Sequence, residues 1–130
     1  MIALDTSAIA AIALKEPEAR IFAEIIGSDS CLVGWPTILE SHMVLKSIPL
    51  RRGLDVLDMV LKAPRLRVLS FDQRLFDSAR AAFDRFGRGH HRAKLNFGDC
   101  MSYAVAKLHD VPLLFKGDDL RQTDVRAALR

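Results

Sequence analysis

Short apolar runs alternate with longer amphipathic segments along the whole chain. The runs at 1–4, 31–34, 67–69 and 111–115 have the length and the flanking residues of buried strands. The clearest helix is predicted at 71–86, with an apolar face made of Leu75, Ala79, Ala82, Phe83 and Phe86. Further helices are predicted at 7–14, 17–26, 36–46, 54–62 and 97–109, with a short one after residue 119. Strands that alternate with helices predict an α/β fold, in which a parallel sheet lies between helical layers.

The composition is that of one globular domain spanning residues 1–130. Half of the residues are hydrophobic and 27% are charged, so a core can form and disorder of the whole chain is excluded. The two cysteines, Cys31 and Cys100, belong to no CxxC pair and no Cys/His cluster. This excludes a disulfide scaffold or a zinc site and suits a reducing cytoplasm.

The apolar start of the chain does not have the character of a secretory leader. No positive charge precedes residues 1–14, and Asp5 interrupts them. No later apolar stretch reaches the roughly 18 residues that a membrane span needs. We therefore expect a cytoplasmic protein with no membrane contact.

Positive charge is concentrated in one segment. The formal net charge is +3, and residues 85–94 contain Arg85, Arg88, His90, His91, Arg92 and Lys94. Together with Lys116, such residues would bind phosphate groups without reading sequence, although a solvated charged loop has the same composition. Trp35 and Tyr103 could stack on bases, but we expect both in the core.

Acidic residues occur where strands end and where a helix begins. Asp5 ends the first apolar run, Asp118 and Asp119 follow the last, and Asp99 falls in the first turn of a helix. Glu40 lies in a mostly apolar helix. Each has an ordinary explanation on its own, as a cap, a turn or an exposed residue. Together, at one rim of a parallel sheet, they would repel one another unless a hard cation such as Mg²⁺ or Mn²⁺ lay between them.

Four segments, in this order, give the chain a family resemblance. They are IALDTSAIAAI, ILES, LNFGDCMSYAVAK and PLLFKGDDLRQTDV. With them the chain resembles the PIN-domain ribonucleases, and among these the VapC toxin of the type II VapBC toxin–antitoxin system. The resemblance implies a PIN-like three-layer α/β/α fold with a central parallel sheet of about four or five strands.

The resemblance also implies an activity and a set of site residues. The activity is Mg²⁺-dependent endoribonuclease cleavage of RNA by metal-activated water, with Mn²⁺ as a possible substitute. The expected catalytic carboxylates are Asp5, Glu40, Asp99 and Asp118, of which Asp5, Asp99 and Asp118 would hold the metal. Thr6, Ser7 and Asp119 would support them, and Asp119 could replace Asp118. The expected RNA-binding residues are Arg85, Arg88, Arg92, Lys94 and Lys116.

The partners implied by the resemblance are an RNA substrate, a cognate VapB-type antitoxin and a second copy of the chain in a homodimer. Two other functions stay open from the sequence. One is a housekeeping RNA-processing nuclease without an antitoxin, and the other is a non-catalytic RNA- or protein-binding module on the same fold.

Overall fold

A parallel sheet in the order β3-β2-β1-β4 forms the centre of the computed structural model, which describes residues 1–49 and 52–129. Its strands are β1 (Ile2–Leu4), β2 (Cys31–Gly34), β3 (Leu66–Leu69) and β4 (Leu113–Leu114). Ala3 of β1 pairs with Leu32 on one side and Leu113 on the other, so β1 is an inner strand. The predicted parallel sheet is confirmed, with four strands in the described residues.

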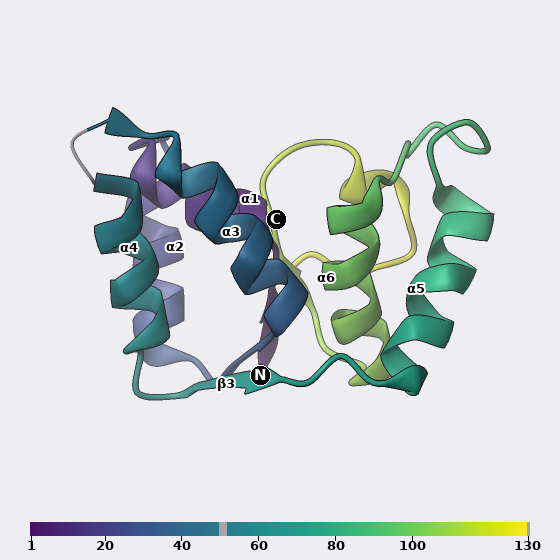
Figure 1. Ribbon diagram of the computed structural model, residues 1–130, viewed down its shortest axis with the longest axis horizontal. Helices are drawn as coiled ribbons and strands as arrows, with labels where there is room; N and C mark the ends of the chain where they lie inside the picture. Colours follow the sequence, from purple (N-terminus) through teal and green to yellow (C-terminus); the bar gives the residue numbers. More distant parts are fainter. Residues whose placement is uncertain (50–51, 130) are drawn as a thin grey trace.

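Helices cover both faces of this sheet (Figure 1). One layer holds α1 (Thr6–Ala13), α2 (Ala19–Ser28), α3 (Trp35–Lys46) and α4 (Arg52–Leu61), and the other holds α5 (Gln73–Phe86) and α6 (Phe97–Leu108). Successive strand residues face opposite sides. Ile2 and Leu4 therefore pack with the first layer, whereas Ala3 packs with the second. This arrangement confirms the three-layer α/β/α architecture.

Some local predictions were wrong. The second helix begins at Ala19, not at residue 17, and continues past residue 26 to Ser28. The first helix begins at Thr6, not at residue 7, and its N-cap is Asp5, whose side chain accepts from the Ser7 amide. Phe83 is exposed and stacks edge-on against His90. Trp35 is also exposed, whereas Tyr103 is buried as expected.

The strand order places a crevice at the carboxyl end of β1. The chain passes from β1 to β2 and β3 on one side, and then crosses through α5 and α6 to β4 on the other side of β1. Ligands bind at such a reversal of strand order in parallel sheets. The loop that joins α5 to α6 lies beyond the upper end of both helices in Figure 1, so α6 begins at that end. No helix in the described ranges is long and apolar enough to cross a membrane.

Candidate active site

A polar cavity of about 250 Å³ opens at the carboxyl edge of the sheet. Three separate segments form it: the end of β1, the first turn of α6 and the turn after β4. Its lining residues are Asp5, Ser7, Asp99, Lys116, Gly117, Asp118, Asp119 and Leu120. The structure therefore brings together four of the acids that the sequence singled out, from both ends of the chain.

Asp5 is the most enclosed of these acids, with 4% of its surface exposed. Its Oδ2 accepts from the Ser7 amide at 3.0 Å and from the Ser7 hydroxyl at 2.5 Å. Its Oδ1 accepts from the hydroxyl of Ser102 on α6. A buried carboxylate without such donors would be costly, so these bonds hold Asp5 in one orientation.

Glu40 lies on α3, and its carboxylate contacts the start of α6, next to the cavity-lining Asp99. Its Oε1 accepts from the Thr6 hydroxyl at 2.5 Å. Its Oε2 lies against Gly98 in the first turn of α6, where a Cβ atom would overlap it. Because Gly98 has no side chain, the Glu40 carboxylate reaches the residue next to Asp99.

Asp99 is held by a reciprocal cap at the start of α6. Its backbone N–H donates to Asn96 Oδ1 at 2.9 Å, and its Oδ2 accepts from the Asn96 N–H at 3.1 Å. Burial raises the pKa of Asp99 to about 6, and the charges of Asp5, Asp119 and Glu40 add to that rise, opposed by the Asn96 N–H bond. Three other carboxylates are therefore close enough for their charge to act on Asp99.

Asp118 and Asp119 both line the cavity after Gly117. The charge of Asp119 contributes to the raised pKa of Asp99, and Asp118 is not among the causes of that rise. Of the two, Asp119 is therefore the acid whose charge acts on Asp99. The role of Asp118 as fourth acid stays a prediction.

Lys116 is tied to the loop between α1 and α2. Its Nζ lies 3.1 Å from a carboxylate oxygen of Glu16 and 3.1 Å from one of Glu18. Its backbone N–H donates to Ser7 Oγ at 3.0 Å. The amine that was predicted to bind RNA thus already has two acidic partners in the structure.

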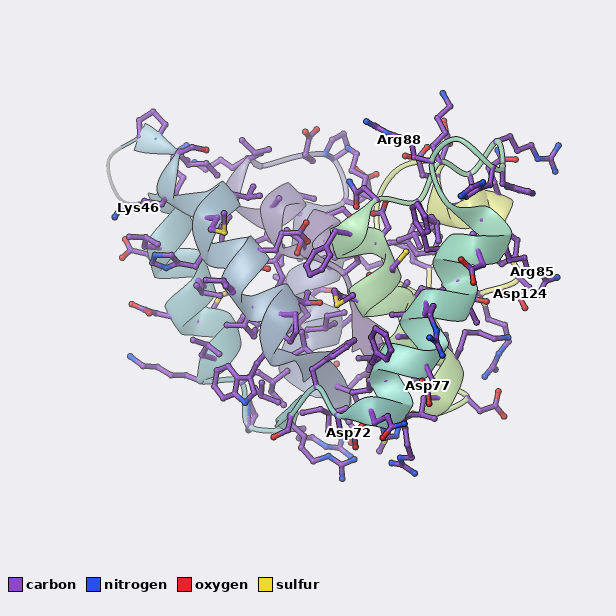
Figure 2. All side chains as sticks on the ribbon, turned by 45° about the vertical axis from the view of Figure 1, so that its right-hand side comes forward. Lys46, Asp72, Asp77, Arg85, Arg88 and Asp124 are labelled. Carbon is purple, nitrogen blue, oxygen red and sulfur yellow. The ribbon has the colours of Figure 1, made fainter. Side chains whose placement is uncertain are left out.

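The basic residues of the α5–α6 loop differ in their surroundings. Arg85 pairs with Asp124 at 3.3 Å, and Figure 2 shows the two side by side. Arg88, Arg92 and Lys94 are exposed and form no ion pair with a described residue. Figure 2 shows Arg88 at the upper end of the molecule, beyond the end of α5. Within this loop, the side chains of these three residues are therefore accessible to an anion.

The donor set at the cavity fits a hard divalent cation in its chemistry. It consists of carboxylate and hydroxyl oxygens, which Mg²⁺ and Mn²⁺ prefer, and mutual repulsion that a cation would relieve contributes to the raised pKa of Asp99. Within residues 1–49 and 52–129, no three His, Cys, Asp or Glu side chains stand together as a ready metal site. The carboxylates of Asp5, Glu40 and Asp99 each accept a hydrogen bond from nearby protein donors instead.

An apolar groove with a volume of about 970 Å³ runs along α3. Its lining includes Leu39 (60% exposed), Met43 (66%) and Phe97 (76%), together with Glu40. Glu40 thus lines the groove and also contacts Gly98, the residue before Asp99. His42 also lines the groove and is exposed.

Three residues that support the acids were not predicted from the sequence: Asn96, Gly98 and Ser102. Asn96 stands three positions before Asp99, which is the spacing of a cap, so this role could have been found. Ser102 stands three positions after Asp99 and shares its helix face. Nothing local indicates that Gly98 meets Glu40, because that contact joins two distant helices.

The family model described as PIN domain matches residues 2–126. Ribonuclease VapC of Mycolicibacterium smegmatis is 40% identical over 125 residues, which cover 95% of this chain and 97% of that one. Among solved structures, Mycobacterium tuberculosis VapC20, a toxin that cleaves the sarcin–ricin loop, aligns with a TM-score of 0.75 at 16% identity, covering 96% of each chain. VapBC2 of Rickettsia felis, solved with a DNA fragment from its promoter, aligns with a TM-score of 0.70 at 14% identity, covering 98% of this chain and 97% of that one.

The fold and the acidic cavity are those of an α/β/α protein with carboxylates at a sheet edge. The chain belongs to the PIN domain family, and its relatives at about 40% identity are VapC ribonucleases.

Ionisation of Asp99 should destabilise the metal-free protein. The folded pKa of about 6 lies above the ordinary value of 3.8, so the unfolding free energy falls as pH rises from about 4 to 6. We expect roughly 1–2 kcal/mol from this group, once its partial exposure is allowed for. Asp99→Asn should remove that part of the pH dependence in urea unfolding with EDTA present. Asp77→Asn, which removes an exposed acid on α5, should keep the full pH dependence. If the unfolding free energies of wild type and Asp99→Asn changed in parallel with pH, the raised pKa would not belong to Asp99.

Proposed function

We propose that this chain is the toxin ribonuclease of a type II toxin–antitoxin pair and that its acidic cavity cleaves RNA with the help of a divalent cation. The observation that carries this proposal is the meeting of Asp5, Asp99 and the Asp118–Asp119 turn in one cavity, with Glu40 beside it. The ribonucleases named among its relatives support hydrolysis of RNA over a purely binding role.

In this proposal, Asp5, Asp99 and Asp118 hold the cation, and Asp119 supports or replaces Asp118. A bound Mg²⁺ or Mn²⁺ would neutralise phosphate charge and lower the pKa of a water molecule. Ser7 keeps Asp5 oriented toward the cavity.

Glu40 has a separate role in the proposal. The Thr6 hydroxyl fixes the Glu40 carboxylate through Oε1, and Glu40 would bind the cation through water or orient the attacking water.

Removing one acid should abolish cleavage. Asp99→Asn should lower the rate of RNA cleavage in Mg²⁺ by more than about 100-fold, beyond the 10–100-fold typical of groups that only support a metal ligand. EDTA should have a similar effect on the wild type.

The matched control for that measurement is Asp77→Asn, which removes an exposed carboxylate. Figure 2 shows Asp77 near the lower end of α5, away from the loop that holds Arg88. Cleavage that persists in EDTA, or full activity of Asp99→Asn, would disprove the metal-dependent mechanism.

RNA would be gripped by the α5–α6 loop. Replacing Arg88, Arg92 and Lys94 with alanine should weaken RNA binding and reduce the slope of log affinity against log salt by roughly 2, at about 0.7 per phosphate contact on a single strand. Fluorescence anisotropy at several salt concentrations measures this slope. The control replaces Arg20, Arg65 and Arg74, exposed cations outside the loop, and an equal loss of slope there would mean that the loop has no special role.

The antitoxin would bind in the apolar groove beside Glu40. Leu39 and Met43 are one turn apart on α3 and both exposed, which suits an amphipathic helix of the partner. A basic side chain of the same partner could then reach the carboxylates past Glu40. Occupation of the groove would thus place the inhibitor next to the site that it blocks.

Charges placed in the groove should separate the toxin from its antitoxin. Leu39→Asp and Met43→Asp should abolish co-purification with the product of a small reading frame beside this chain's own gene, while Ile21→Asp, exposed outside the groove, should not. Size-exclusion chromatography of the chain alone tests the expected homodimer. If the same variants convert a dimer to a monomer and leave the antitoxin bound, the groove takes a second copy instead. If no such partner exists, the RNA-processing function replaces the toxin.

A further inference from the structure

Ser102 is a buried residue whose hydroxyl contacts Asp5, one of the acids of the cavity. It lies on α6 one turn after Asp99 and has 0% of its surface exposed. Its hydroxyl donates to Asp5 Oδ1, and its Oγ lies 3.3 Å from the backbone oxygen of Asp99. One side chain therefore touches both of the segments that carry Asp5 and Asp99.

The other oxygen of Asp5 is fixed by a relay of two donors. The backbone N–H of Lys116 donates to Ser7 Oγ, so the Ser7 hydroxyl proton is free to point at Asp5 Oδ2. The Ser7 amide donates to the same oxygen. Both carboxylate oxygens are thus held by protein donors, and Ser102 supplies the donor that acts on Oδ1.

We propose that Ser102 is a positioning residue, which orients Asp5 for the divalent cation and sets its spacing from Asp99. This proposal rests on the proposed function, since it assumes that Asp5 is a metal ligand. Hydrogen bonds to a ligand's other lone pairs fix its orientation, and their loss typically costs 10–100-fold in metal affinity. Without the hydroxyl, Asp5 Oδ1 loses the Ser102 donor, and the Ser7 donors on Oδ2 alone restrain the carboxylate.

Metal binding by the EDTA-stripped protein tests this role directly. In isothermal titration calorimetry with Mn²⁺ and with Mg²⁺, Ser102→Ala should bind about 10–100-fold more weakly than the wild type. Tyr103→Phe is the matched control. It removes a neighbouring buried hydroxyl that also donates to a carboxylate, Asp124, outside the cavity. Its metal affinity should stay close to that of the wild type, and circular dichroism checks that each variant is folded.

A double-mutant cycle with Asp5→Asn separates positioning from a general loss of packing. If Ser102 acts through Asp5, the effect of Ser102→Ala on metal affinity should disappear in the Asp5→Asn background. Ser102→Cys, which keeps the volume and a weak donor, should bind with intermediate affinity and serves if the alanine variant does not fold.

The outcomes are distinguishable. Equal affinity of Ser102→Ala and wild type, an equal loss in Tyr103→Phe, or additive effects in the cycle would overturn the role of Ser102 and leave the proposed function standing. A wild-type protein that binds neither cation at millimolar concentration would overturn both.

Discussion

Repulsion between carboxylates held at one edge of the sheet is the constraint on which this structure depends. Asp5, Glu40, Asp99 and Asp119 approach closely enough for burial and mutual charge to raise the pKa of Asp99 well above its ordinary range. A fold relieves such repulsion by hydrogen bonds, by protonation or by a cation. Here Thr6, Ser7, Asn96 and Ser102 all donate to one of these acids. These hydrogen bonds offset part of the free energy that burial and mutual repulsion of the carboxylates cost.

The strand ends and helix starts that carry acids could be predicted from the sequence because they depend on local pattern. Asp5 after an apolar run and Asp99 in a first helical turn are examples. The contact of Glu40 with Gly98 could not, because it arises only when α3 packs near α6. The role of Ser102 could not be predicted either, because its contact with Asp5 exists only once α6 packs beside the end of β1. Trp35 was expected in the core, yet it lines an open groove, since apolar character alone does not tell a core from a binding surface.

The turn after β4 shows a further limit of sequence. Gly117 has a φ of +108°, a conformation that favours glycine, and the residues after it turn sharply into a short 3₁₀ helix at Leu120–Gln122. Which of two adjacent aspartates points toward Asp99 depends on that turn and not on residue type. Lys116 on the other side of the glycine is fixed by Glu16 and Glu18. The rim of the cavity is therefore anchored through residues that carry no catalytic chemistry.

Gly98 has a consequence for how this protein could lose its activity. A methyl group at that position would occupy the space of Glu40 Oε2 and push the carboxylate away from the start of α6. The displaced atoms belong to a flexible side chain, so the fold would survive. A genetic selection for variants that have lost toxicity should then recover substitutions of Gly98 as well as substitutions of the acids. Absence of a side chain is here as specific a requirement as the presence of a charge.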